Sequence, residues 1–446
     1  MNNVLDLVDH TFFRVERSAG MTNVIQCMWM YEHGIDIDGL RRFHQHLQQG
    51  RLSRSVERSP LPFGRHRWVT PNAQPELQIV ETPRPRAEFD AWCDEQTNTA
   101  LDAEFGPGWH LAVLPFTEGG AGVSLVASHC LTDAVGLYQA LADAADGHDN
   151  GGLWPAAGSR RRLRALCEDA CQTTRDIPAI GRAAVAAAQF IRRNHDHTAP
   201  ARAPMTANDE SITPATATVF VDADEWDARA RTLGGTTNSL FLALAARLAQ
   251  RVGRVTADGT VEMTMAVNER TGGDTRANAI TNVDFTVDPA PATADLRAIR
   301  AATKRALIRS KDEPDVRWTL LPLVPLVPER LGKQWVGAAT NSAATVGSSN
   351  IGLVDPAANR PDGSGADHFA MRSLPAGMTK GMVHQLGGLL SLLGGIANGR
   401  LFVSVVASPS PEAGSNDELR QHVSSVLREF SLSSAIGWPC TEPAGR

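Results

Sequence analysis

The chain has 446 residues, more than a single hydrophobic core normally organises, so two domains or lobes are expected. Its formal net charge at pH 7 is −6, which argues against a protein that binds nucleic acid through a basic surface. Hydrophobic residues make up 42% and charged residues 21% of the chain, a balance typical of soluble globular proteins.

Cysteine usage and the apolar segments indicate the compartment. Six cysteines are scattered along the chain without a Cys-x-x-Cys motif, which predicts a reducing, cytoplasmic environment. The first residues lack the basic region and long apolar core of a signal peptide. The most apolar late stretch, Leu386 to Ala407, is interrupted by glycine pairs and by Asn398-Gly399. It predicts two strands joined as a hairpin rather than a membrane span.

The first 150 residues mix strands and helices. Periodicity and capping residues predict a strand over Val24 to Tyr31 and helices over Asp36 to Gln49 and Ala87 to Ala103. Two apolar runs, Trp109 to Phe116 and Gly122 to Ser128, flank a Gly-rich turn and predict a hairpin.

A helical connection separates this region from the rest. The stretch over 146–159 is rich in Gly and Asp, Arg160 to Arg193 is rich in Ala and Arg with helical character, and His195 to Ser211 is polar and contains proline. These shifts divide the chain into an N-terminal lobe (1–150), a helical crossover linker (151–212) and a C-terminal lobe (213–446).

The C-terminal lobe repeats the mixture of strands and helices. It begins with a predicted strand over Ala215 to Val221 and a helix from Ala223. Thr236 precedes an apolar helix over Leu240 to Ala249 and is placed to cap its start. Thr260 to Val267 alternates as a strand does, and a helix is predicted over Thr293 to Ser310. The chain therefore belongs to the α/β (α+β) class.

A histidine stands at the end of a buried strand in the first lobe. The apolar run ends at Ser128, His129 follows, Asp133 comes four residues later, and a helical pattern begins at Ala134. A side chain at a strand end is held by a rigid element and opens toward a cleft, which suits a general base. The aspartate lies where a carboxylate caps a helix. The alternative for His129 is a hydrogen-bonded core histidine.

This stretch resembles the HHxxxDG motif of one acyltransferase superfamily. The superfamily includes chloramphenicol acetyltransferase, the condensation domains of nonribosomal peptide synthetases and the wax ester synthase/diacylglycerol acyltransferases. The second motif histidine falls on His129 and the aspartate on Asp133, while Ser128 replaces the first histidine and Ala134 the glycine.

Two further segments resemble the wax ester synthase/diacylglycerol acyltransferases. Leu5 to Glu16 is similar to the start of those proteins, and Pro107-Gly108-Trp109 is similar to their PLW motif. The resemblance implies two chloramphenicol-acetyltransferase-like lobes, each a mixed sheet backed by helices, with an active-site tunnel between them.

The resemblance also implies a set of site residues. Arg270 ends a strand whose terminal arginine pairs with the motif aspartate in this superfamily, so Asp133, Arg270 and Ser128 are expected to be structural. Thr281 to Phe285 and Gly347 to Gly352 resemble the lobe-crossing strand and the tunnel-lining loop. The residues implied to contact substrate are Trp109, Asn282, Ser349 and Asn350.

On this interpretation the protein is an O-acyltransferase of lipid or natural-product biosynthesis. His129 would take the proton of an acceptor hydroxyl as its oxygen attacks an acyl thioester, so no acyl-enzyme forms. Cys130 is the rival nucleophile, but strand neighbours point to opposite faces, so its side chain should turn away from the cleft. The donor would be acyl-CoA or an acyl carrier protein, with no metal and no further cofactor.

Two other functions stay open. A free-standing condensation enzyme would form an amide with an amine acceptor, and a non-catalytic protein of the same fold would bind the acyl thioester without transferring it. The departures at Ser128 and Ala134 motivate the second. The basic run Arg160 to Arg164 could bind the phosphates of coenzyme A, a carrier protein or an anionic membrane surface, although a solvated helix face is the default interpretation.

Overall fold

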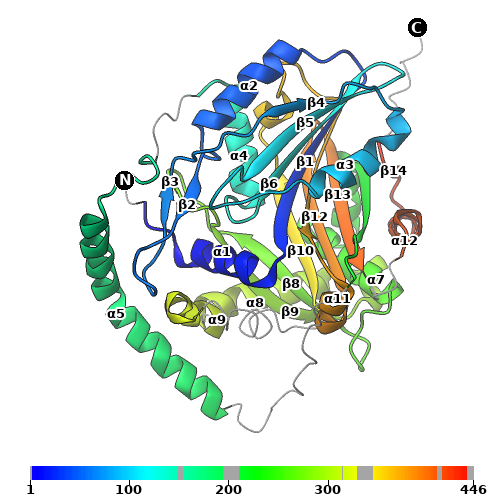
Figure 1. Cartoon of the computed structure of the whole chain (residues 1–446). Helices are drawn as coiled ribbons and strands as arrows, with labels where there is room; N and C mark the ends of the chain where they lie inside the picture. The colour runs from blue at the N-terminus through cyan, green and yellow to red at the C-terminus, as the bar shows by residue number, and fades with distance from the viewer. Residues whose placement is uncertain are drawn as a thin grey trace.

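Two mixed β-sheets form the centre of the molecule, and helices pack against them (Figure 1). The computed structural model describes residues 3–148, 154–193, 210–313, 315–328, 345–408 and 414–438. The first sheet has the strand order β11 (His368–Ala376), β1 (Thr22–Tyr31), β6 (Ala121–Ser128), β5 (Trp109–Pro115), β4 (Leu77–Ile79). The second has the order β14 (Ala435–Ile436), β7 (Ala215–Asp222), β13 (Arg400–Ser408), β12 (Leu389–Ala397), β10 (Val346–Leu353), β8 (Val261–Asn268), β9 (Ile280–Val287). Strands β2 (Ser55–Glu57) and β3 (Arg67–Val69) pair separately.

The helices follow the alternation that the sequence predicts. In the first half they are α1 (Leu7–Ala19), α2 (Ile37–Gln49), α3 (Phe89–Thr97), α4 (Ala134–Ala145) and α5 (Arg162–Arg193). In the second half they are α6 (Ala223–Thr232), α7 (Thr237–Arg251), α8 (Arg297–Asp312), α9 (Val316–Leu320), α11 (Lys380–Leu386) and α12 (Asn416–Glu429). Short 3-10 turns cover Arg86–Glu88, Ala290–Thr293, Leu321–Leu326 and Pro356–Asn359.

The first sheet is buried on both faces around its central strands. All residues of β6 are buried, as are those of β1 from Val24 onward. The sequences of such strands are continuous apolar runs, because neither face of the strand is exposed to water. The predicted hairpin is present, since β5 and β6 pair antiparallel with Pro115 opposite Ala121.

The second sheet has two faces of different chemistry. On one face Leu392, Val403 and Met263 join a core with helix α7. Helix α7 begins at a capping box, in which Thr236 and Ser239 exchange side-chain and backbone hydrogen bonds. The opposite face is turned toward the first sheet, and this is where the candidate site lies.

One strand from late in the chain crosses into the first sheet. Strand β11 lies within residues 213–446, yet it pairs with β1 along the first sheet. The boundaries drawn along the chain therefore do not separate the two sheets. The expectation that Thr281 to Phe285 crosses between lobes is wrong: that segment lies in β9, which pairs with β8 at the edge of the second sheet. Gly347 to Gly352 is not a loop but part of strand β10.

Two predicted helix boundaries are also wrong. The helix expected to run to Ala103 ends at Thr97. The side chains of Thr97 and Asn98 both donate to the carbonyl of Asp94, at 2.7 and 3.4 Å, and such local bonds compete with helix continuation. The helix expected from Thr293 begins at Arg297, after Asp295 accepts a hydrogen bond from the Arg297 amide.

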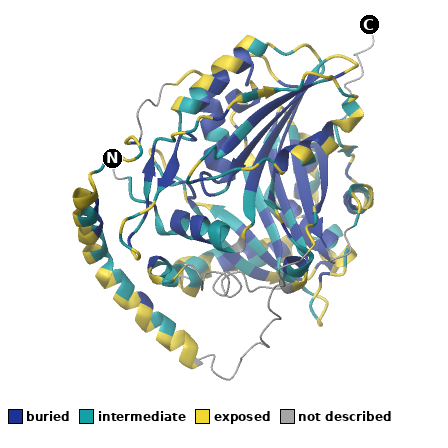
Figure 2. Ribbon diagram, viewed as in Figure 1, coloured by how far each residue is buried: buried dark blue, intermediate teal, exposed yellow. Residues whose placement is uncertain are grey.

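Helix α5 connects the lobes along the outside of the molecule and is largely exposed (Figures 1 and 2). The polar connection predicted over 195–211 falls mostly outside the described residues.

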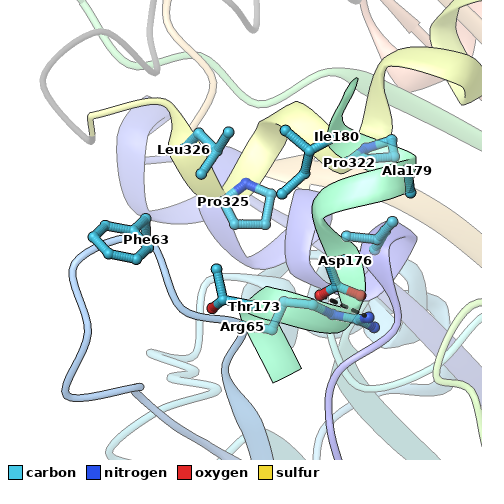
Figure 3. A pocket seen from close by; sticks show the side chains of 10 residues that line it. Phe63, Arg65, Thr173, Asp176, Ala179, Ile180, Pro322, Pro325 and Leu326 are labelled. Atoms are coloured by element: carbon cyan, nitrogen blue, oxygen red, sulfur yellow. Dashed lines mark ion pairs between the residues drawn. The ribbon is translucent and has the colours of Figure 1, made fainter. Parts of the chain in front are cut away.

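A cavity of about 20 Å³ lies where α5 meets the turn at Pro322 and Pro325, beside an ion pair of 3.7 Å between Arg65 and Asp176 (Figure 3). That volume holds about one water molecule, so it is no ligand site. Within the described ranges every helix is too short or too polar to cross a bilayer.

The hairpin between β12 and β13 supplies a test of the fold. Asn398 and Gly399 have φ of 50° and 71°, as a two-residue type I′ turn requires. Gly399→Ala should lower the free energy of unfolding by about 1–2 kcal/mol, because a side chain is strained at positive φ. Gly181→Ala on exposed α5, where nothing lies within 4 Å of the new methyl, should raise it by up to about 1 kcal/mol.

Thermal unfolding of both variants measures the difference. Equal shifts of the same sign would contradict this turn geometry.

Candidate active site

His129 directly follows the last residue of β6. Its backbone amide donates to the carbonyl of Asn23 on β1 at 2.8 Å, and the amide of Ser128 donates to the carbonyl of Gly108 at 2.9 Å. The imidazole stacks on the ring of Phe12 from α1, with centroids 4.7 Å apart and planes 3° apart. Backbone and ring are therefore both held by the first lobe.

Asn278 of the second lobe determines which nitrogen of His129 carries the proton. The Asn278 Nδ2 group donates to the His129 carbonyl at 3.0 Å and to Asp9 Oδ1 at 3.2 Å. Its Oδ1 therefore faces His129 Nδ1, 2.9 Å away, and can only accept. Nδ1 must be protonated, which leaves the lone pair on Nε2. Nε2 has no hydrogen-bond partner among the described residues, and the ring lines a cavity.

Asp9 of helix α1 holds Asn278 in this orientation. The carboxylate accepts hydrogen bonds from the backbone amides of Ala277 at 3.0 Å and Asn278 at 2.8 Å. Burial disfavours the charged form and raises the pKa of Asp9 to about 6, although Arg54 opposes the shift.

Burial also acts on the histidine. Desolvation lowers the pKa of His129 below its ordinary value of 6.5, while the charge of Asp133 and the hydrogen bond to Asn278 oppose this shift. The ring is thus neutral at pH 7, and a neutral ring can accept a proton.

The predicted ion pair between Asp133 and Arg270 is present. Arg270 Nη2 lies 2.8 Å from Asp133 Oδ2, and both side chains are 3–4% exposed. The contact uses one guanidinium nitrogen, because the guanidinium also donates to the carbonyls of Arg276 and Ala277, at 3.0 and 2.9 Å. A Cβ at Gly136 would come within 2.9 Å of Arg270 Nη2, so this helix position has no room for a side chain.

Asp133 also performs the predicted capping. Its Oδ1 accepts from the amide of Gly136 at 2.6 Å, and its Oδ2 accepts from the amide of Ala279 at 2.7 Å. Together with Arg270, the carboxylate thus accepts from three donors. Asp133 is therefore arranged to hold structure together rather than to accept a proton.

Ser128 and Cys130 point away from the cavity, as strand alternation predicts for neighbours of His129. Both side chains donate to Glu16 Oε2 of α1, at 2.9 and 3.1 Å. Burial raises the pKa of the Cys130 thiol well above its usual range, so it stays protonated and is a poor nucleophile. Burial likewise raises the pKa of Glu16.

A cavity of about 350 Å³ lies between the two sheets at His129. Its volume is at the small end of ligand pockets. The first sheet and its helices contribute mainly apolar groups, and the second sheet contributes many small polar ones. The described lining residues are Phe12, Ile25, His129, Asp133, Ala134, Val135, Thr264, Ala266, Asn268, Ile280, Asn282, Gly347, Ser348, Ser349, Asn350, Ile351, Ser373, Ser391, Leu392, Leu393 and Ser404.

Three of the four residues expected to contact substrate line this cavity: Asn282, Ser349 and Asn350. Trp109 does not. Its indole is 2% exposed and meets His44 of α2 edge to face, with ring centroids 5.3 Å apart. Trp109 begins β5, opposite Ala127, and packs on the helix side of the sheet, so it belongs to the core.

Sequence reasoning missed Asn278 and Asp9. Asp9 carries no distinctive signal, because α1 buries His10 and Arg14 as well as Phe13. Asn278 stands between two alanines and carries no pattern of its own.

Two of the four arginines in the basic run near α5 form ion pairs. Arg160 lies 2.9 Å from Glu57 and 3.0 Å from Asp169, and Arg164 lies 2.8 Å from Glu168. Across the described ranges no three His, Cys, Asp or Glu side chains are placed to bind one metal ion.

No protein-family model matches the sequence, and no curated protein is significantly similar to it. Among solved structures, the first condensation domain of the calcium-dependent antibiotic synthetase in complex with a substrate analogue has a TM-score of 0.59 and 14% identity, covering 97% of this chain and 96% of that one. The wax ester synthase/diacylglycerol acyltransferase from Marinobacter aquaeolei VT8 has a TM-score of 0.55 and 14% identity, covering 96% and 98%.

A third similar structure is the condensation domain of the monacolin K polyketide synthase, with a TM-score of 0.53, 12% identity and 97% of both chains covered. These likenesses extend over nearly the whole chain. They confirm the two-lobed fold that the motifs implied, with its two mixed sheets backed by helices.

The buried ion pair predicts a large stability effect. Arg270→Met leaves the buried carboxylate of Asp133 without its cation, which should lower the free energy of unfolding by about 3–5 kcal/mol. The matched control is Arg297→Met. Arg297 also lies 2.8 Å from an aspartate, but its side chain is 79% exposed.

Denaturant unfolding monitored by tryptophan fluorescence compares the two variants with wild type. The control should unfold as wild type does, because exposed pairs contribute little. An equally small effect of Arg270→Met would refute the structural role of the pair.

Proposed function

We propose that the protein is an acyltransferase that moves an acyl group from a thioester to a hydroxyl, with His129 as general base. The observation that carries the proposal is the unpaired Nε2 of His129 at a cavity between the lobes, with Nδ1 held by Asn278. The similarity of the fold to condensation domains and to a wax ester synthase supports acyl chemistry in general.

The reaction needs one proton carrier and no covalent intermediate on the protein. Nε2 takes the proton of the acceptor hydroxyl while its oxygen attacks the thioester carbonyl carbon. The carbonyl becomes an oxyanion, and its collapse breaks the carbon–sulfur bond. The leaving thiolate then takes the proton from the imidazolium. The products are an ester and a thiol, and His129 returns to its neutral form.

Polar groups along the second sheet are suited to the oxyanion. The Ser349 hydroxyl and the Asn282 amide line the cavity, and neither side chain has a hydrogen-bond partner within the described ranges. Preorganised donors of this kind stabilise charge that appears only in the transition state. We assign the donor thioester to this side of the cavity, carried by coenzyme A or by a carrier protein.

The charge of the cavity favours a hydroxyl over an amine acceptor. The ionisable side chains among the described lining residues are His129 and Asp133, and Asp133 is occupied by Arg270 and two backbone amides. Among the described lining residues, no carboxylate is free to bind an ammonium group. An amide-forming condensation enzyme remains the second candidate, supported by the condensation domains of similar fold.

The departures from the motif do not remove a group from the cavity. Ser128 replaces a histidine but points to Glu16. Ala134 adds only a methyl group to the lining. A non-catalytic binding role would be the better description only if donor binds without transfer.

His129→Ala should lower kcat by about 10²–10⁴-fold, the usual contribution of a general base, and leave donor KM nearly unchanged. His33→Ala, at an exposed position beyond β1, is the control and should behave as wild type. Thiol release from an acyl thioester with hydroxyl and amine acceptors measures both. Undiminished transfer by His129→Ala, with the fold intact by circular dichroism, would exclude the mechanism.

The lowered pKa of His129 predicts the pH profile. The ring must be unprotonated to act, so kcat/KM should rise with pH through a midpoint below 6.5 and then stay level. Asn278→Ala removes a hydrogen bond that favours the charged ring, so the midpoint should fall further.

Asn278→Ala also removes the group that keeps the proton of the neutral His129 ring on Nδ1. The plateau of kcat/KM at high pH should therefore drop by roughly 10- to 100-fold, as expected for a misaligned group. Asn98→Ala, at an exposed helix end, is the control. A midpoint above 6.5, or one that Asn278→Ala does not move, would contradict this assignment.

A further inference from the structure

The cavity face of the second sheet carries many small polar side chains among apolar ones such as Ile280 and Ile351, although it is enclosed between two sheets. Thr264 of β8 lies opposite Gly347 of β10, and Gly347 lies opposite Ser391 of β12. In the next row Leu393 of β12 lies opposite Ser404 of β13. Because side chains alternate along a strand, these residues share one face and the apolar partners of α7 occupy the other. Small hydroxyl side chains thus stand beside Leu393 on a face that would be apolar throughout in a site for a long alkyl chain.

Besides Ser349, two hydroxyls that line the cavity, those of Ser373 and Ser391, are unused within the described residues. Ser404 Oγ is 3.1 Å from Thr218 Oγ1, and Ser348 Oγ donates to the Thr264 carbonyl at 3.3 Å. Ser391 and Ser373 line the cavity, but their hydroxyls have no hydrogen-bond partner in the described part of the chain. They come from different sheets, since Ser373 lies on β11 opposite Ile25 of β1.

A long alkyl chain would leave such hydroxyls without partners once water is displaced, which is unfavourable. A hydroxylated compound would satisfy them as donors and acceptors. The described lining residues offer no free charge, and the cavity volume of about 350 Å³ is small. Ile25 and Val135 supply apolar surface for a short carbon skeleton.

We propose that the acyl acceptor is a small, uncharged polyol whose further hydroxyl groups bind Ser373 and Ser391. This rests on the proposed acyl transfer by His129 and adds the class of acceptor. The reacting hydroxyl meets His129 Nε2, and the other hydroxyls orient the molecule.

Matched acceptors test the proposal with the whole protein. Acyl N-acetylcysteamine thioesters serve as donor, because they present the end of the arm that coenzyme A and carrier proteins share. The acceptors are 1,2,6-hexanetriol against 1-hexanol, inositol against cyclohexanol, and 1-hexadecanol. Thiol release gives kcat/KM for each, and calorimetry of polyol binding gives a second measurement that needs no turnover.

Wild type should prefer each polyol over its matched alkanol by at least about tenfold, since a site built to bind hydroxyls rejects analogues that lack them. Ser373→Ala and Ser391→Ala should each reduce that ratio severalfold, weaken polyol binding and leave the alkanol rates and donor KM unchanged. Ser424→Ala on α12 removes a hydroxyl that donates to the Arg420 carbonyl at 2.7 Å and does not line the cavity, so it should not change the ratio.

Three results would overturn the proposal. Faster transfer to 1-hexanol or 1-hexadecanol than to the polyols, dependent on His129, would refute the acceptor class and leave acyl transfer standing. An increase in donor KM in the serine variants at a constant polyol ratio would assign these hydroxyls to the donor arm. No thiol release with any acceptor, and no polyol binding, would refute acyl transfer and the polyol site together.

Discussion

One short segment of the second lobe, Arg276 to Ala279, holds the candidate active site together. Its carbonyls accept from Arg270, two of its amides donate to Asp9, and the amide of Ala279 donates to Asp133. The Asn278 side chain completes the set by accepting from His129. The site side chains of the first lobe, Asp9, His129 and Asp133, are therefore all held by four consecutive residues of the second lobe.

This arrangement explains why the chemistry requires both lobes. The first lobe supplies the imidazole and fixes its backbone through β1 and β6, but the tautomer is set from the other side. The buried Asp133–Arg270 pair joins the start of α4 to the segment before β9. A buried charge pair tolerates little displacement, because either ion alone would be poorly solvated. The relative position of the lobes and the protonation of the base are thus coupled in one network.

Many of the strands and part of the candidate site could be predicted from the sequence. Apolar runs bounded by turn residues predicted β1, β5, β6 and the β12–β13 hairpin, since local patterning decides those elements. The histidine at a strand end and the aspartate four residues on predicted the placement of His129 and Asp133, and the motif resemblance supplied the ion pair with Arg270.

The rest depends on contacts between distant parts of the chain. Neither Asp9 nor Asn278 lies in a periodic pattern that marks it, because their significance arises only when α1 and the second lobe meet. The crossing of β11 into the first sheet could not be read from local composition, since a buried strand looks alike in either sheet. Trp109 was misplaced because a motif match carries no information on which face of β5 the indole occupies.

The most direct measurement is the state of the His129 ring itself. A long-range ¹H–¹⁵N correlation spectrum of labelled protein at pH 7, assigned with His129→Ala, distinguishes the two neutral tautomers and the charged ring. The structure predicts a neutral ring with the proton on Nδ1 and a bare Nε2. A ring protonated at Nε2, or charged at this pH, would contradict a base that is ready to deprotonate an acceptor.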